Sequence, residues 1–429
     1  MSSITKSPPT APAGLGPVRA KPAPNRARHN FGFWAAALAF VIVQAYNTIP
    51  APLYGIYKQR DGFSSFMVTI IFAALAIGVV ISLFTIGHIS DWHGRRRLFL
   101  PAIVLCMISA AVFLLWRSLP GLLVGRLLGG LAVGMVSATA TAWIAELHGH
   151  ARPEASMRRA QVVSTAAILG GLGVGALVSG VLAEWVTSPL TVPYLVSLGA
   201  LAVAFLAVVA APETRERVQP RPTWRPQRVS VPQHAVGSFV AACIGAAIAF
   251  AVFGLFTSLS STFLATSLGH PSLALAGATT FAVFSAAVVT QTLIKSQDPR
   301  PMMSVGIAVT VVGLAGLVVS VWLNTPSLVM FLAGGVVTGA GVGALWKGVV
   351  IMVGELAPPD RRAEALAGLF LAANLGLTVP SIGLGIMTQY LSARLSLLIF
   401  AGVLVLGAAA AAPRLLAGPE GSGKPAGRR

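Results

Sequence analysis

The sequence is poor in charge, and above all in acidic residues. Only 10% of its 429 residues are charged, 12 are acidic, and 55% are apolar. A water-soluble domain usually carries about a quarter charged residues. Together with a mean hydropathy of +0.81, this composition excludes a soluble globular protein and predicts a chain that lies mostly in lipid.

Cysteine and clustered polar groups are also scarce. The two cysteines, Cys106 and Cys243, fall inside apolar runs, so no disulfide framework or zinc-type site is predicted. The chain lacks a phosphate loop of the Gly-rich, Lys-Ser/Thr type, which argues against direct use of ATP. The seven histidines and 12 acids show no metal-ligand or nucleophile spacing. We therefore expect no metal, no cofactor and no enzymatic activity.

Long apolar runs dominate the rest of the chain. A bilayer core about 30 Å thick needs roughly 20 apolar residues per helix. Runs of that length are predicted at 34–56, 67–89, 98–117, 119–145, 160–186, 192–211, 235–263, 273–294, 302–322, 327–353, 363–390 and 394–412. Because they are continuous rather than alternating, they favour helices over barrel strands. The predicted fold class is an all-α integral membrane protein with twelve transmembrane helices.

The formal charge of +18 comes from basic residues that gather on one side of this topology. With the N-terminus inside, the outer segments hold only Lys58, Arg60, Arg117 and Arg394, which is the positive-inside pattern. The charge therefore indicates orientation and contact with the lipid bilayer rather than a nucleic-acid partner. The high content of Ala, Gly, Arg and Pro is typical of a GC-rich bacterial genome, so we expect a multi-pass protein of the bacterial plasma membrane, with both termini cytoplasmic.

The chain divides into two related halves. A Pro- and Arg-rich break after helix six cannot lie in a membrane. The glycines expected to pack helix five, Gly171, Gly175 and Gly180, match Gly376, Pro380 and Gly385 of helix eleven at a constant offset, which indicates a duplication. We predict a monomer composed of a disordered cytoplasmic tail (1–30), a six-helix bundle (31–211), a cytoplasmic linker (212–234), a second, pseudo-symmetric six-helix bundle (235–412) and a cytoplasmic tail (413–429).

The loop after helix two carries the most specific motif. It runs from Gly87 through Asp91 and Gly94 to Arg95 and Arg96, and it resembles the signature loop of the major facilitator superfamily. The resemblance implies a transporter in which Asp91 contacts the positive N-terminal end of helix eleven and so closes the cytoplasmic side. Alternatively, Asp91 only pairs with the neighbouring arginines.

Two further segments resemble motifs of that family. Arg126, two turns inside helix four, is followed by Leu127-Leu128-Gly129-Gly130, which is similar to a motif of proton-coupled members in which the arginine influences a proton or substrate site. Alternatively, it reaches outward to the headgroups as an anchor. The segment from Gly170 to Gly180 looks like the glycine-rich motif of exporters, but it carries Ala176 where that motif has proline.

Polar side chains at helical spacing predict the substrate path. Amides in a membrane need partners, so these faces should point toward water, substrate or each other. The candidates are Gln44, Asn47, Tyr54, Gln291, Trp346, Lys347, Asn374 and Thr378. Bonding between helices is an equal alternative for any one of them, and Lys347 could instead extend to the cytoplasmic interface.

These features predict a secondary transporter that moves a small-molecule substrate by alternating access, with proton-coupled efflux as the first choice. A sugar or organic-acid symporter, an uncoupled facilitator, and a receptor or scaffold without transport activity remain alternatives. No acidic residue lies near the centre of any predicted helix. The candidates for coupling to protons are therefore Asp91 and Arg126, and the alternatives are a histidine or one of the glutamates near a helix end, which are Glu146, Glu184 and Glu355.

Overall fold

The computed structural model describes residues 26–85, 93–215, 232–358 and 361–417, and every regular element within these ranges is helical. Twelve helical spans of this described chain are long and apolar enough to cross a membrane. They coincide with the twelve predicted runs, so the all-α fold class is confirmed. Backbone groups in the interior of a regular helix bond to one another, which is what a lipid environment requires.

The N-terminal half, residues 26–215, is a bundle of six spans around its own apolar core. Its elements are α1 (Arg26–Thr48), α2 (Pro50–Asp61), α3 (Ser65–Thr85), α5 (Arg95–Leu115), α6 (Leu119–Ala151), α7 (Arg158–Thr165), a π-helical turn (Ala166–Gly170), α8 (Gly171–Trp185) and α9 (Val192–Ala210).

The C-terminal half, residues 232–417, forms the second bundle with a separate core. A short 3₁₀ turn precedes α10 (Val236–Ser258), which is followed by α11 (Ser260–Thr266), α12 (Leu273–Leu293), α13 (Pro299–Trp322), α14 (Leu328–Leu356), α15 (Arg362–Tyr390) and α16 (Ala393–Ala417). The linker predicted at 212–234 and the two predicted tails lie mostly outside the described residues. Residues 26–30 and 413–417, which were predicted to belong to the tails, are instead helical and lie in α1 and α16.

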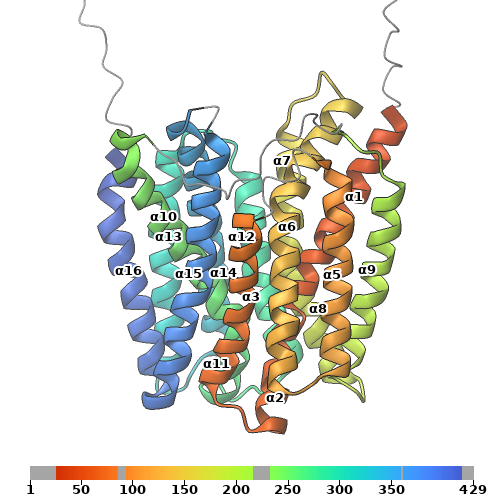
Figure 1. The fold of residues 1–429 in the computed structure, drawn as a ribbon. Helices are drawn as coiled ribbons and strands as arrows, with labels where there is room; N and C mark the ends of the chain where they lie inside the picture. The colour runs from red at the N-terminus through yellow and green to blue at the C-terminus, as the bar shows by residue number, and fades with distance from the viewer. Residues whose placement is uncertain (1–25, 86–92, 216–231, 359–360, 418–429) are drawn as a thin grey trace, which may run out of the picture.

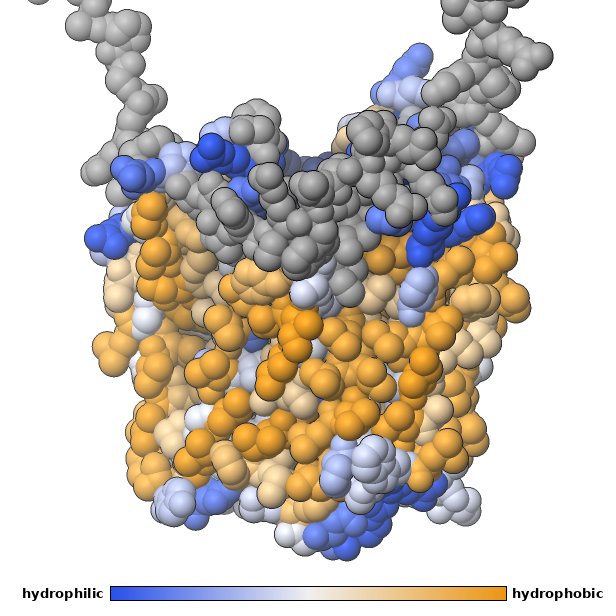
Figure 2. Space-filling view, in the orientation of Figure 1, coloured by the Kyte–Doolittle hydropathy of each residue, from blue (hydrophilic) through white to orange (hydrophobic). Residues whose placement is uncertain are grey.

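The helices of both halves stand side by side, and α1 begins at the same end of the bundle at which α16 finishes (Figure 1). We call this the terminal end, and the opposite end, where α2 finishes and α6 begins, the far end. Apolar side chains cover the middle of the visible face, and hydrophilic ones gather at both ends (Figure 2). This band of apolar surface is what a bilayer core would cover.

The first predicted span is not one continuous helix. Pro50 and Pro52 have no N–H group, so the helical bonds back to residues 46 and 48 cannot form, and α1 gives way to α2 at Ile49. The carbonyl oxygen of Tyr46 accepts instead from the backbone nitrogen of Ile49 at 3.2 Å. Two other carbonyls at this break accept from neighbouring helices: that of Ile49 from the Ser179 hydroxyl at 2.5 Å, and that of Asn47 from Arg126 at 2.7 Å. The seventh span is also interrupted, at Leu259 between α10 and α11.

Glycine lets the two halves touch at the far end. α3 packs against α15 and α8 against α12. A Cβ on Gly385 would collide with Thr69, and one on Gly180 would lie 3.2 Å from the Cα of Gly277 in the other half. Because both contacts lie near the far end, the halves are closed against each other there.

Candidate functional site

A cavity lies between the two halves, at mid-depth. Its empty volume is about 920 Å³ including its opening, and it extends toward the terminal end as far as Leu83. The wall is formed by Gln44, Asn47, Thr48, Ala51, Phe72, Leu75, Val79, Leu83, Arg126, Val133, Ser137, Ile168 and Leu172 from the N-terminal half, and by Phe250, Phe253, Thr257, Phe284, Phe370, Asn374 and Leu377 from the C-terminal half.

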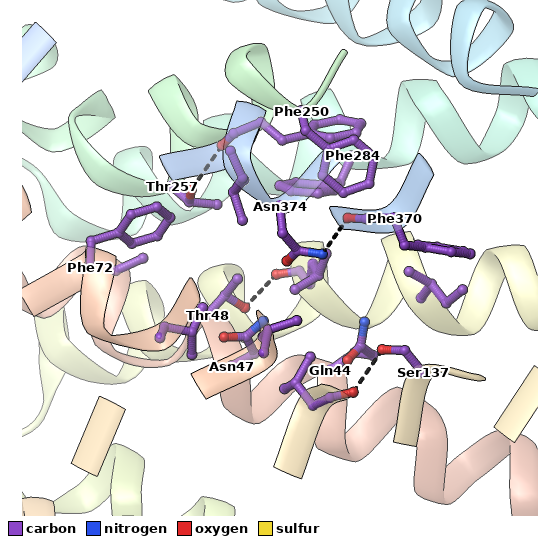
Figure 3. Close-up of a pocket in the computed structure, with 18 of the residues that line it drawn as sticks. Gln44, Asn47, Thr48, Phe72, Ser137, Phe250, Thr257, Phe284, Phe370 and Asn374 are labelled. Carbon is purple, nitrogen blue, oxygen red and sulfur yellow. Dashed lines mark hydrogen bonds between the residues drawn. The ribbon is translucent and has the colours of Figure 1, made fainter. Parts of the chain in front are cut away.

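Three of the seven polar residues that line the cavity come from α1. Thr48 is fixed by a 2.6 Å hydrogen bond from its hydroxyl to the carbonyl oxygen of Leu172. Gln44 is buried, yet its Oε1 has no partner among the described residues, and neither does the Oδ1 of Asn47. Figure 3 shows these three side chains with Ser137 on one side of the cavity. Buried amides without partners are suited to bind a polar group that enters the cavity.

Arg126 is the charged member of the wall. Its side chain is 2% exposed, so it does not reach the far end as an interfacial anchor. The Nε donates to the Tyr54 hydroxyl at 2.7 Å, Nη2 donates to the same hydroxyl, and Nη1 donates to the carbonyl oxygen of Asn47. The guanidinium also lies 5.8 Å from the ring centroid of Phe72. It is thus held at the carbonyl end of α1, where the helix dipole is negative.

The opposite wall is aromatic. Phe253 stacks on Phe284 with ring centroids 4.4 Å apart, and Trp346 packs edge-on against Phe250 and Phe370 from outside the lining. Phe250, Phe284 and Phe370 lie across the cavity from the polar α1 residues in Figure 3. Asn374 adds an amide to this wall, with its Nδ2 bonded to the carbonyl oxygen of Phe370 at 2.8 Å.

The predicted path residues therefore separate into two groups. Gln44, Asn47, Asn374 and the coupling candidate Arg126 line the cavity. The remaining candidates do not line it: Tyr54, Gln291, Trp346, Lys347 and Thr378. Tyr54 still belongs to the site, because it holds Arg126.

Lys347 binds the C-terminal end of α12 and does not contact the cavity. Its Nζ donates to the carbonyl oxygens of Gln291 at 3.0 Å and Ile294 at 2.6 Å, where α12 ends. A lysine at a helix C-terminus satisfies orphan carbonyls and the negative end of the dipole. Thr378 bonds within its own helix, to the carbonyl oxygen of Asn374.

The signature loop is described only in part, since Gly87 and Asp91 lie outside the described residues. Gly94 has a φ of +103°, which disfavours any residue with a side chain, and a Cβ there would lie 2.6 Å from the Glu213 carboxylate. Glu213 caps α5 by accepting from the backbone nitrogens of Arg95 at 2.9 Å and Arg96 at 3.1 Å. The Arg95 side chain pairs with Glu146 at 3.0 Å.

The three glycines of the fifth span contact two different partners. A Cβ on Gly171 would lie 2.8 Å from the backbone of Val41, and one on Gly175 would collide with the carbonyl of Ala45, so both allow α8 to approach α1. Gly180 instead allows contact with α12 of the other half. Gly376 and Gly385 repeat this division in α15, against Ala247 of α10 and Thr69 of α3.

The phenylalanines of the aromatic wall were not among the predicted path residues. Phe250, Phe253 and Thr257 recur at helical spacing on α10, which places them on one face, but the spacing of phenylalanines alone does not distinguish a cavity from lipid. Among the described residues, no group of three or more His, Cys, Asp or Glu side chains could hold a metal ion. The described lining residues include no Asp, Glu or His, and they offer hydrogen bonds, one positive charge and aromatic surface.

The fold and the cavity define a class: multi-pass membrane proteins whose two six-helix halves enclose a central site. The family model of the Major Facilitator Superfamily matches residues 36–323 and 293–429. The chain therefore belongs to this superfamily of membrane transporters.

Named relatives match over a smaller part. An arabinose-proton symporter of Bacillus subtilis is 30% identical over 123 residues, 28% of this chain and 26% of that protein. An uncharacterised MFS-type transporter of Methanocaldococcus jannaschii is 23% identical over 134 residues, 31% of this chain and 34% of the relative. The matched region thus spans about a quarter to a third of these relatives.

Solved structures match over most of the chain. A variant of the nucleoside transporter NupG superposes with a TM-score of 0.68 at 14% identity, covering 90% of this chain and 100% of the other. The human organic anion transporter TETRAN superposes with a TM-score of 0.66 at 15% identity, covering 89% and 99%. At these identities the likeness shows the shared fold.

Proposed function

We propose that this protein is a secondary active transporter that exports a small organic solute from a bacterial cell by alternating access, in exchange for protons. The observation that carries the proposal is the cavity between the halves, with a polar wall from one half and an aromatic wall from the other. Export is favoured by the three motifs that resemble those of exporting, proton-coupled members of the family.

Alternating access requires a site that one end of the protein closes while the other end opens. The far end is closed by the glycine contacts between α8 and α12 and between α3 and α15. The cavity extends from Arg126 toward the terminal end, where Leu83 and Ser137 line it. Rocking of the halves about the cavity would open the far end and close the terminal end.

We assign the terminal end to the cytoplasm. The basic side chains Arg95, Arg96, Arg158 and Arg159 lie on helix ends at this side, as the positive-inside rule expects of cytoplasmic segments. In this orientation both termini are cytoplasmic, the inner membrane is the location, and the closed far end faces outward. The protein would thus be in an inward-facing state and would act as a monomer.

Two residues are proposed to couple transport to protons. Asp91 is the candidate for a latch on the N-terminal end of α15, and Asp91→Asn should reduce flux while the protein still reaches the membrane. Arg126 is the charge that a moving proton or substrate would meet in the cavity. The match to an arabinose-proton symporter supports proton coupling in general and keeps symport of a sugar or organic acid as a second candidate.

Reconstituted vesicles test the proposal. The purified protein is sealed into liposomes with a pH-sensitive dye inside, and drugs, sugars and organic acids are added in turn under an imposed pH gradient. Proton movement that requires one class of compound supports coupling, and its direction separates antiport from symport. Equilibration of labelled solutes without proton movement would identify an uncoupled facilitator, and no flux of any compound would overturn the transport proposal.

A further inference from the structure

The charge of the cavity restricts the substrate more sharply than its shape does. Among the described residues that line the cavity, Arg126 is the one with an ionisable side chain. In a site partly shielded from water, a cationic solute would face this charge with no carboxylate to offset it. The wall therefore disfavours cations, although it would accept a neutral or an anionic molecule.

Arg126 has no acidic partner among the described residues. Its three hydrogen bonds go to neutral oxygens, the Tyr54 hydroxyl and the Asn47 carbonyl, so two of its five N–H groups have no acceptor. A buried charge is costly unless it is paired, and the carbonyl end of α1 supplies only a partial negative charge. The site is thus electrostatically incomplete until an anion enters.

The guanidinium is also held in place for such a ligand. The Tyr54 hydroxyl accepts hydrogen bonds from two nitrogens of the guanidinium. The third nitrogen donates to the carbonyl oxygen of Asn47, next to the break between α1 and α2. A planar guanidinium fixed in this way can donate two parallel hydrogen bonds to a carboxylate. Gln44, whose buried amide has no partner at Oε1, lies in the same wall.

The aromatic wall of the cavity indicates what the rest of the substrate molecule should be. Phe250, Phe253, Phe284 and Phe370 offer ring surface from the C-terminal half, and Figure 3 shows Phe250, Phe284 and Phe370 across the cavity from Gln44 and Asn47. An aromatic or alkyl body would lie there, because burying apolar area is favourable at roughly 25 cal/mol per Å². One molecule would thus contact both halves.

We infer that the substrate is an amphipathic organic anion, with a carboxylate bound by Arg126 and an apolar, preferably aromatic, body held by the phenylalanines of the C-terminal half. This inference rests on the proposed transport function and adds the substrate class. The ligand bridges the halves, so its binding free energy depends on their relative position, as a transported substrate requires.

Three probes with one ring system test the inference: 2-naphthoate, 2-naphthamide and 2-naphthylmethylammonium. At pH 7 they are anionic, neutral and cationic. Their dissociation constants are measured by equilibrium dialysis with the purified full-length protein. We expect 2-naphthoate to bind at least about tenfold more tightly than the amide, a difference of about 1.4 kcal/mol, and the ammonium compound to bind most weakly. Equal affinities, or preference for the amide or the cation, would overturn the inference.

Variants assign the effect to Arg126. In Arg126→Gln the preference for 2-naphthoate over the amide should fall to about one, because the variant loses more affinity for 2-naphthoate than for the amide. The matched control is Arg117→Gln, because Arg117 is exposed and bonds to Thr191 away from the cavity; it should keep the preference. Retention of the full preference in Arg126→Gln would refute the assignment. Should that variant not fold, the comparison of the three probes on the unaltered protein still decides the substrate class.

Flux separates this inference from the proposed function. If 2-naphthoate binds selectively but neither it nor any other compound of the panel crosses the vesicle membrane, the transport proposal fails and the anion site stands. If a cation is transported and 2-naphthoate does not compete, transport stands and the anion site is refuted.

Discussion

The carboxylate of Glu184 lies at the first turn of α12, with its Oε2 2.7 Å from the backbone nitrogen of Leu273 and 3.3 Å from that of Ala274. Glu184 belongs to α8 of the N-terminal half and α12 to the other half. An anion at a helix N-terminus satisfies orphan N–H groups and the positive end of the dipole. The pair therefore fastens the two halves together at the closed far end.

Glu184→Gln should weaken this closure. The charge at an exposed helix N-terminus is worth about 0.3–1 kcal/mol, so the population with an open far end should rise roughly two- to fivefold. Spin labels on Thr187 and Ser392, which are both exposed at this end, would detect this increase as a larger share of long distances between the labels. Glu154→Gln, an exposed acid at the terminal end, is the control. Unchanged distances for Glu184→Gln would show that the contact does not govern closure.

Gly180 tests the same closure through packing. A Cβ at this position would meet the carbonyl oxygen of Leu273 at 2.5 Å and the Cα of Gly277 at 3.2 Å, both in the other half. We expect Gly180→Ala to force the halves apart at the far end and to lower vesicle flux severalfold, with the thermal unfolding midpoint lowered by a few degrees at most.

Gly199→Ala is the matched control, because nothing lies within 4 Å of a Cβ there. This variant should keep normal flux and be slightly stabilised, by about 0.5–1 kcal/mol, since alanine favours a helix. Equal flux in both variants would contradict a role for close contact between α8 and α12.

Lys347 should act on stability rather than on substrate choice. Its two hydrogen bonds to carbonyls at the end of α12 are charge-assisted, and it does not line the cavity. Lys347→Met should lower stability by about 1.5–3 kcal/mol, measured by thermal unfolding in detergent, and Lys347→Arg should restore part of it. The order of affinity for the three naphthyl probes should not change. A reversed order in Lys347→Met would instead place this lysine in the substrate path.

Much of the fold follows from the sequence, because a lipid environment permits few backbone conformations. Apolar runs of membrane length must be helical, and Gly171, Gly175 and Gly180 at close spacing indicate close helix contact before the partner helix is known. The sequence could not say that Gly180 touches the other half while Gly171 touches α1, since both partners are distant in the chain.

The site was less accessible to prediction. A polar residue such as Gln44 has few stable positions in a membrane, so a polar face predicts an inward direction. A phenylalanine is equally stable against lipid, in a core or in a cavity, so Phe253 and Phe284 carried no such information. Lys347 was ambiguous because the carbonyls it binds are exposed only where α12 ends, and α12 lies on a different part of the chain.

The inferred charge of the substrate makes a prediction about driving force. A cell membrane is negative inside, and moving one elementary charge through 100 mV corresponds to about 2.3 kcal/mol. An exported monoanion moves down this potential, which alone would support a concentration ratio on the order of 50-fold. An anion carrier can therefore export without a carboxylate in its cavity, and no described acidic residue lines this one.

Vesicles loaded with 2-naphthoate and potassium salt, at equal pH on both sides, test this. Valinomycin and a low external potassium concentration make the interior negative, and we expect faster loss of 2-naphthoate than without valinomycin. Protein-free vesicles correct for passive leakage, and 2-naphthamide, which carries no charge, should be unaffected. If the potential leaves the rate of 2-naphthoate loss unchanged while a pH gradient accelerates it, the carried species is electrically neutral overall, and a proton must accompany each anion.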